Sequence, residues 1–229
     1  KLINFIREYA VLILIVILMI ALTIASDAFL SPRNLLNILN QNAPLAIIAA
    51  ALTLCIIAGG FDLSTASIFG VASCLAAWIA VNIDPYLGLA LAPIIGIILG
   101  YVNGVLITSL GVHSFLATIA TSLIYRGIAI LITGGFLIPV RMPEFIWLGR
   151  GKVYGIHYTI FILIFFTIIM SVILNRTTFG RNVFAVGGNE EASKLSGIRV
   201  NLITIYTFAL TGFEAGIAGA IQVSRISLG

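Results

Sequence analysis

The chain has 229 residues, of which 61% are hydrophobic and only 9% are charged. A soluble domain carries roughly 25% charged residues, and one of this length buries only about 70% of the surface that its unfolded chain exposes. This composition therefore predicts a chain that folds in a lipid bilayer, and it excludes a soluble enzyme, a nucleic-acid-binding protein, a disordered tail and a disulfide-stapled scaffold. The formal net charge of +4, from 12 basic and 8 acidic residues, indicates only that cytoplasmic loops face anionic lipid.

Seven segments are long and apolar enough to cross a bilayer, for which a helix needs about 20 mainly apolar residues. Polar clusters with proline or glycine separate them, and none alternates like a barrel strand. We therefore expect an all-α, polytopic helical membrane protein with about seven spans, forming a single transmembrane domain over residues 1–229. Because the chain begins at Lys1 and stops at Gly229 just after an apolar segment, we interpret it as truncated at its C-terminus. The predicted spans are 9–26, 43–60, 64–82, 87–110, 114–134, 157–174 and 202–222.

The basic residues do not decide the orientation of these spans. With the N-terminus in the cytoplasm, six basic residues lie inside and five outside, which is almost no bias. The segment 175–201 is the most polar in the chain, and this favours a cytoplasmic N-terminus. The inside set is Lys1, Arg7, Arg176, Arg181, Lys194 and Arg199, and the outside set is Arg33, Arg141, Arg150, Lys152 and Arg225.

Glycines recur at four-residue spacing in two of the predicted spans. Residues at this spacing line one helix face and let two backbones approach closely, which drives helix association in lipid. Such a face either slides during transport or packs statically, and static packing is the commoner role. The glycines are Gly96, Gly100 and Gly104 in one span, and Gly212 and Gly216, followed by Gly219, in the other.

The junction between the second and third spans combines two glycines, Gly59 and Gly60, with Asp62. The glycines loosen the helix, and Ser64 or Thr65 can cap the next one. Asp62 belongs either to an interrupted helix whose terminus faces a polar solute, or to an ordinary cytoplasmic turn at a helix N-terminus.

Two segments end alike, with Ile-Ala-Gly-Gly-Phe at residues 57–61 and Ile-Thr-Gly-Gly-Phe at residues 132–136. In the expected topology they run in opposite directions through the membrane. They therefore indicate an inverted repeat with interrupted helices, with a chance match over five positions as the alternative.

Two charged residues, Arg126 and Glu214, lie near the middle of predicted spans. An unpaired charge there costs at least about 2.5 kcal/mol. We expect them to pair across the fifth and seventh spans or to face a shared aqueous path. Further polar residues that could line a path, or form single interhelical hydrogen bonds, are Asn103, Thr118, Thr121, Ser122 and Gln222.

The sequence contains no GxSxG, HExxH, CxxC or P-loop motif. We therefore expect no catalytic residues, no bound metal or cofactor, and no ATP hydrolysis by this chain. His113 beside Ser114 is the only hint of a hydrolase, and adjacency in sequence does not make a dyad. Cys55 and Cys74 lie in apolar runs and are interpreted as small packing residues.

The segment 175–201 contains a short helix with signals at both ends. Asn189 is the predicted N-cap, Glu190 can pair with Lys194 four residues later, and Gly197 provides the stop. A helix this short is marginal in water, so we expect it to rest on its own bundle or in a groove of a cytoplasmic partner. Its small apolar face comprises Ala192, Leu195 and Ile198.

Two motifs resemble those of the permease subunits of bacterial ABC importers for monosaccharides, the ribose, xylose, arabinose and autoinducer-2 type. These are related more distantly to branched-chain amino-acid permeases. Residues 59–67 read Gly-Gly-Phe-Asp-Leu-Ser-Thr-Ala-Ser, where the family usually has Gly-Gly-Ile-Asp-Leu-Ser-Val-Gly-Ser. Residues 179–198 match the family pattern Phe-Gly-Arg…Ala-Val-Gly-Gly-Asn…Ala…Leu-Ser-Gly-Ile. The resemblance extends over essentially the whole chain.

The resemblance implies the membrane subunit of an ATP-driven sugar importer, which is not itself an enzyme. It places the protein in the bacterial cytoplasmic membrane, with a cytoplasmic N-terminus and with residues 175–201 as a cytoplasmic coupling loop. The implied partners are an ATP-binding subunit, a periplasmic or extracellular sugar-binding protein and a second permease chain, identical or not. The coupling helix begins after Asn189 and docks in a cleft of the ATPase. The alternative is an ion-coupled secondary transporter or channel without an ATPase. The residues assigned to coupling are Gly180, Arg181, Gly188, Asn189, Glu190, Ala192, Leu195, Ser196 and Gly197.

Overall fold

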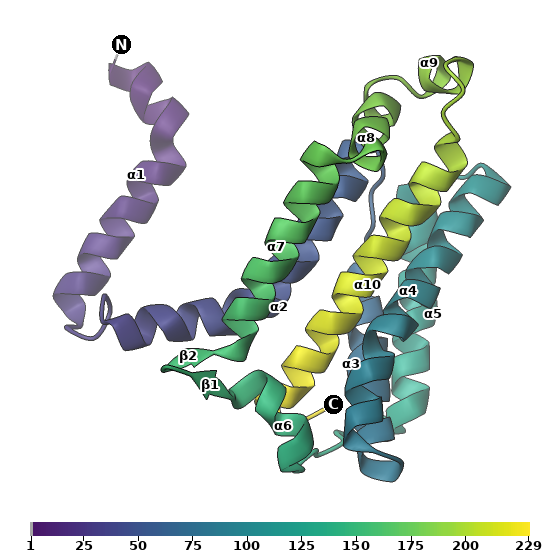
Figure 1. Ribbon diagram of the computed structural model, residues 1–229. Helices are drawn as coiled ribbons and strands as arrows, with labels where there is room; N and C mark the ends of the chain where they lie inside the picture. Colours follow the sequence, from purple (N-terminus) through teal and green to yellow (C-terminus); the bar gives the residue numbers. More distant parts are fainter. Residues whose placement is uncertain (1) are drawn as a thin grey trace. The chain divides into compact units, whose positions relative to one another are not determined.

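The structure of the protein, a computed structural model, describes residues 2–229 (Figure 1). Lys1 and the side chain of Arg7, two of the basic residues assigned to the cytoplasmic side, lie outside the described part. The chain divides into two compact units, which meet in sequence between Gln41 and Asn42. The described helices are α1 (Leu2–Ala25), α2 (Pro32–Ile57), α3 (Thr65–Asn82), α4 (Pro85–Leu110), α5 (Ser114–Thr133), α6 (Pro143–Arg150), α7 (Tyr158–Arg176), α8 (Thr178–Gly188), α9 (Glu190–Leu195) and α10 (Val200–Ile226).

Six of the described helices, namely α2, α3, α4, α5, α7 and α10, are long and apolar enough to cross a membrane. The predicted class, a polytopic helical membrane protein, is confirmed. A single hairpin of β1 (Lys152–Val153) and β2 (Ile156–His157) is the only sheet in the described residues. The predicted first span, 9–26, falls on α1, in which Tyr9–Ala25 is an apolar stretch of the described residues.

The start of α2 differs from the prediction, which placed the second span at residues 43–60. The polar cluster around Pro32 begins this helix instead of separating two spans. Proline fits the first helical position because its missing N–H needs no partner there. The Ser31 hydroxyl also accepts the Asn34 N–H at 3.3 Å, as an N-cap does. Pro44 lies inside the helix, and α2 ends at Ile57.

The core of the unit Asn42–Gly229 is the contact between α4 and α10. The Gly96 and Gly212 backbones approach so closely that a Cβ added to either glycine would overlap the carbonyl oxygen of the other. A Cβ on Gly100 would overlap the Phe208 carbonyl oxygen in the same way, and one on Gly104 would lie 2.6 Å from the Ile205 Cα. This is the backbone-to-backbone packing that small residues allow in lipid. Gly216 meets α4 at the Ala92 carbonyl oxygen.

The two ends of this unit carry different short elements (Figure 1). At one end α8 packs on the last residues of α2 and the first turn of α10, through an apolar cluster that includes Val183, Val186 and Ile57. At the other end α6 is fixed to the end of α10, because the Ser224 hydroxyl accepts the Gly149 N–H at 2.7 Å and donates to the Phe145 carbonyl at 2.6 Å.

The two similar segments at residues 57–61 and 132–136 both follow the end of a helix. Gly59 has a φ of 84° and Gly134 a φ of 63°, a left-handed conformation that glycine adopts without strain. The first segment follows α2 and the second follows α5. The inverted repeat itself stays a prediction.

Candidate functional site

Residues 58–64 form a break between α2 and α3, and this break is the first part of the site. Gly59 turns the chain, and the Gly60 N–H donates to the Cys55 carbonyl at 2.9 Å. A side chain at Gly60 would lie 2.9 Å from the Cys55 sulfur and 3.1 Å from the Phe208 ring. The break therefore starts in a close fit between the last turn of α2 and α10.

Asp62 lies at the centre of this break and is 95% buried, with 5% of its surface exposed. Its Oδ1 accepts both the backbone N–H of Ser64 at 2.9 Å and the Ser64 hydroxyl at 2.6 Å. Its Oδ2 is buried and has no hydrogen-bond partner among the described residues. Asp62 is thus not part of a solvent-exposed turn. Ser64 occupies the N-cap position of α3 but its side chain caps nothing, because its hydroxyl is committed to Asp62.

A chain of hydrogen bonds from α4 and α5 leads to this carboxylate. The Tyr125 hydroxyl of α5 donates to the Asn103 Oδ1 of α4 at 3.0 Å, and the Asn103 amide donates to the Ser64 hydroxyl at 2.6 Å. The Ser64 hydroxyl then donates to Asp62. The Tyr125 hydroxyl also lies 3.0 Å from the Leu99 carbonyl oxygen of α4. Linked buried bonds of this kind fix the conformation of the break more firmly than isolated ones.

The first turns of α5 hold the backbone of the break. The Ser114 hydroxyl accepts the Phe61 N–H at 2.9 Å, and the Thr118 hydroxyl accepts the Leu63 N–H at 3.2 Å. The Thr118 hydroxyl is also within reach of the Phe61 carbonyl, at 3.1 Å. Backbone groups buried away from water need hydrogen-bond partners. Here two side-chain hydroxyls accept the N–H groups that backbone carbonyls would accept in a continuous helix.

Replacing Thr118 by valine should destabilise the folded protein by about 1–3 kcal/mol, the usual cost of leaving a buried backbone donor unpaired. The Leu63 N–H would lose its acceptor while the size of the side chain stays the same. Thermal unfolding in detergent measures the change, and Thr118→Ser, which keeps the hydroxyl, is the control. Equal unfolding temperatures for the two variants would show that the hydroxyl does not hold the break.

The expected pair of Arg126 and Glu214 is absent. Among the described residues, the only ion pair within 4.0 Å joins Lys194 to Glu190. The Arg126 side chain lies exposed on the outer side of α5, whereas Glu214 is fully buried and accepts the Ala51 N–H of α2 at 2.8 Å. Arg126 lies on an exposed face of α5 and Glu214 faces α2, and hydropathy does not show how a helix is rotated about its axis.

The remaining polar candidates make bonds within their own helices. The Thr121 hydroxyl donates to the Thr118 carbonyl at 3.3 Å, and the Ser122 hydroxyl donates to the Ile119 carbonyl at 2.7 Å. The Gln222 Oε1 accepts from Arg225 at 2.9 Å. These contacts give none of the three a polar partner on another helix.

The segment 175–201 contains two helices, of which the sequence analysis found only α9. α8 was not predicted, and its three glycines within eleven residues lower its intrinsic helix propensity. The missed signal is the helical spacing of Phe179, Val183 and Val186, all three of which pack in one apolar cluster. Thr177 caps α8, since its hydroxyl accepts the Gly180 N–H at 3.1 Å.

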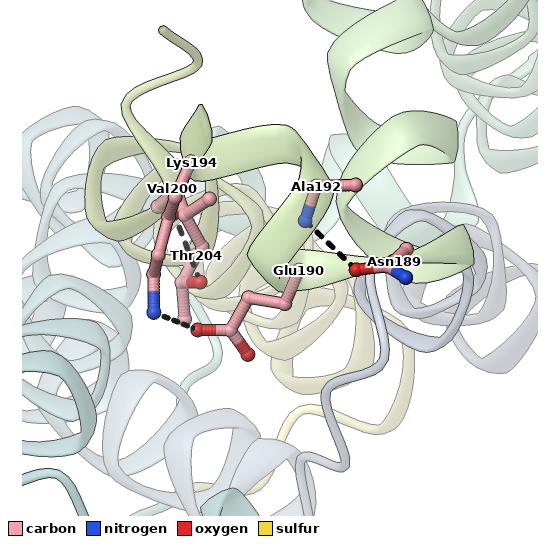
Figure 2. Close-up of polar contacts among 6 residues, drawn as sticks. All are labelled: Asn189, Glu190, Ala192, Lys194, Val200 and Thr204. Atoms are coloured by element: carbon pink, nitrogen blue, oxygen red, sulfur yellow. Dashed lines mark hydrogen bonds and ion pairs between the residues drawn. The ribbon is translucent and has the colours of Figure 1, made fainter. Parts of the chain in front are cut away.

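The end signals predicted for α9 are all present. Figure 2 shows the Asn189 side chain accepting the Ala192 N–H at 2.8 Å and Lys194 paired with Glu190 at 2.6 Å. Gly197 has a φ of 81°, and its N–H donates to the Lys194 carbonyl. The Ile198 N–H bonds back to the Ser193 carbonyl, which completes the standard glycine-based helix stop.

The apolar face assigned to α9 divides in two in the structure. Ala192 is exposed and Leu195 is 91% exposed, whereas Ile198 packs in the cluster around α8. The other residues assigned to coupling also differ in exposure. Gly180 is buried against the end of α7 near the Leu174 carbonyl, while Arg181, Gly188 and Ser196 are exposed.

Gly187 is the glycine of α8 that lies in close contact with the end of α2. It was not among the residues predicted from the sequence. A Cβ there would overlap the Ile57 carbonyl oxygen at the end of α2, whereas one on Gly188 would meet open space. Gly188 is the one of the two that was assigned to coupling from the sequence. Only the position of α2 in the fold distinguishes these two neighbouring glycines.

A cavity of about 250 Å³ lies between the break and the start of α9. Gly59 and Gly60 line it from the break, Glu190 from α9, and His113 and Ser114 from the start of α5. His113 is exposed and its Nδ1 accepts the Phe115 N–H at 3.3 Å. The helix break and the α8–α9 segment are therefore neighbours around one polar cavity.

Residues 34–228 match the protein family described as the permease component of the branched-chain amino acid transport system. The chain is 35% identical over 229 residues to the ribose import permease protein RbsC of Haemophilus influenzae, covering 98% of this chain and 71% of that protein. It is 38% identical over 213 residues to RbsC of Bacillus subtilis, covering 92% and 66%. It is 33% identical over 224 residues to the L-arabinose transport system permease protein AraH of Escherichia coli, covering 97% and 68%.

The chain spans 66–71% of the length of these relatives. No solved structure matches it with significant similarity. The resemblance inferred from residues 59–67 and 179–198 is confirmed by the relatives, which align over nearly the whole chain. With six helices in its described part that are long and apolar enough to cross a membrane, the chain is a multi-pass membrane protein that belongs to the branched-chain amino acid transport permease family.

Proposed function

We propose that this chain is the membrane-spanning permease subunit of an ATP-driven importer of a monosaccharide in the bacterial cytoplasmic membrane. The relatives support this proposal, because they are named as a ribose import permease and an L-arabinose transport system permease. Both sugars are pentoses, so a pentose is the first substrate to test and a hexose the second. ATP hydrolysis takes place on a separate ATP-binding subunit. A sugar-binding protein outside the membrane and a second permease chain complete the importer.

The observation that carries the proposal is the exposed α9. It is fixed at both ends by its caps and the ion pair, and it presents Leu195 to the solvent with 91% of its surface exposed. An apolar side chain held rigidly in this way suits a groove in a partner protein. We place α8 and α9 in the cytoplasm, together with the N-terminus, and α9 in a cleft of the ATP-binding subunit.

A movement of α9 can reach the break through the contact between α8 and the end of α2. α8 follows the end of α7, and its Gly187 touches the last residue of α2, Ile57. The break begins at the next residue, and the hydroxyls of Ser114 and Thr118 hold it to α5. In the proposed mechanism, closure of the ATP-binding subunits moves α9 and α8. The break at Gly59 then changes its backbone conformation, and the transport path opens alternately to the two sides of the membrane.

The alternative, an ion-coupled transporter without an ATPase, would need a charged relay, for which Arg126, Glu214 and Asp62 are the candidates. These residues make separate contacts among the described residues, since Arg126 is exposed, Glu214 accepts the Ala51 N–H of α2 and Asp62 bonds to Ser64 within the break. The relatives also favour an importer of the ABC type.

Replacing Leu195 by aspartate should abolish uptake of the sugar while the protein still inserts and folds. A charge would enter the docking cleft in place of an apolar side chain, and losing such a contact costs about 2 kcal/mol or more, which is more than a tenfold loss of affinity. The measurement is ATP-dependent uptake by proteoliposomes that contain the complete importer. Leu195→Met, which stays apolar, is the control. Normal uptake by Leu195→Asp would remove the docking role of α9.

A further inference from the structure

Glu214 is the one acidic residue of α10, and its side chain is completely buried. Its Oε2 accepts the Ala51 N–H of α2 at 2.8 Å. Its Oε1 is buried and bonds to no other residue that the structure describes. The carboxyl group thus joins α10 to α2 through one oxygen, and its other oxygen accepts no hydrogen bond from the described part of the chain.

The surroundings of Glu214 hold no compensating charge. Within the part of the chain that the structure describes, no basic side chain lies within 4.0 Å of it. Ala51, Leu54, Met170 and Leu210 form an apolar cluster of α2, α7 and α10 around the Ala51 contact. Few titratable side chains occur on the helices around Glu214. They are Cys55 of α2 (from residue 42 onward), Cys74 of α3, Tyr86 and Tyr101 of α4, and Tyr158 and Arg176 of α7, with Tyr206 and Arg225 on α10 itself.

A carboxylate that is fully buried among apolar side chains and has no compensating cation is very expensive inside a membrane protein, and the group takes up a proton instead. A neutral carboxylic acid fits the observed contacts. Its carbonyl oxygen, Oε2, accepts the Ala51 N–H, and the proton resides on Oε1. The cost of burial then falls from that of an ion to that of a polar group with one hydrogen bond.

We propose that Glu214 is a proton-binding site at the contact between α2 and α10, neutral while the two helices touch. When α2 and α10 separate, water reaches the carboxyl group, the O–H bond breaks and the proton passes to water. The carboxylate that remains is then hydrated. Reclosure of the contact returns the proton from water to Oε1. Proton binding therefore favours the closed contact, independently of which solute the protein transports.

Infrared spectroscopy of the full-length protein in lipid tests this site, because the C=O stretch of a neutral carboxylic acid is distinct from the bands of a carboxylate. We expect the wild type to show this band at neutral pH and Glu214→Gln to lose it. Glu144→Gln, which removes an exposed carboxylate of α6, should leave the band unchanged. Asp62→Asn should also retain it, which would assign the band to Glu214 and not to the other buried carboxyl.

Two results would overturn the proposal. One is a wild-type spectrum at neutral pH without a protonated carboxylic acid band, a measurement that requires no variant. The other is a band that persists unchanged in Glu214→Gln. Gln keeps an oxygen acceptor for the Ala51 N–H, so this variant should unfold within a few degrees of the wild type, whereas Glu214→Leu, which lacks the acceptor, should unfold earlier. Neither the infrared nor the unfolding measurement requires an ATP-binding subunit or a sugar. A negative result would therefore contradict the proton-binding role of Glu214 without contradicting the proposed transport function.

Discussion

Gly212→Ala should prevent the normal packing of α4 on α10 and destabilise the protein by about 3 kcal/mol or more, above the usual range for an overpacked core. The added Cβ would overlap the Gly96 carbonyl oxygen and lie 3.0 Å from the Gly100 Cα. Both neighbours are backbone atoms, which cannot move aside by changing rotamer. The two helices would have to move apart along the contact, and the same shift would loosen the contacts at Phe208 and Ile205.

The matched control is Gly127→Ala in α5. Gly127 is also a glycine inside a long apolar helix, but a Cβ there meets no atom within 4 Å. Alanine favours the helix over glycine by about 1 kcal/mol, so this variant should be as stable as the wild type or slightly more stable. Thermal unfolding and size-exclusion behaviour in detergent compare the two. If Gly212→Ala and Gly127→Ala unfold at the same temperature, the α4–α10 contact does not have the close approach described above.

Features that depend on local composition could be predicted from the sequence. The bounds of α5 agree with the predicted span 114–134 to within one residue. Such agreement is expected because the length of an apolar run shows directly whether it can cross the bilayer. The glycine faces of α4 and α10 followed from their four-residue spacing. The ends of α9 were predicted because caps, the i,i+4 ion pair and the glycine stop involve residues only a few positions apart.

Features that depend on the rotation of a helix, or on a distant segment, could not be predicted. Arg126 and Glu214 looked like partners because both are charged and lie at similar depth, yet one is exposed on α5 and the other faces α2. The glycines and Asp62 marked the break, but the residues that complete its network come from other helices. Asn103, on α4, follows Ser64 by 39 positions, and Tyr125 follows Asn103 by 22.

The prediction that tests the coupling route compares Gly187 with its neighbour Gly188. Both glycines end α8, both are exposed, and they differ in what a Cβ would meet. At Gly187 it would overlap the carbonyl oxygen of Ile57, where α2 ends and the break begins; at Gly188 it would meet nothing within 4 Å. Alanine has the same helix propensity at both positions, so any difference between the variants comes from the contact with α2.

Gly187→Ala should therefore displace α8 from the end of α2 and reduce ATP-dependent uptake by about tenfold or more, since a bias of about 1.4 kcal/mol between two conformations changes their ratio tenfold. Gly188→Ala should transport at nearly the wild-type rate. Because the exposed face of α9 is unchanged, both variants should still bind the ATP-binding subunit, and hydrolysis by the Gly187→Ala importer should continue without matching uptake. The measurement is the ratio of sugar imported to ATP hydrolysed in proteoliposomes. Equal ratios for the two variants would mean that the α8–α2 contact does not transmit the movement of α9, and that the force reaches the break through α10 instead.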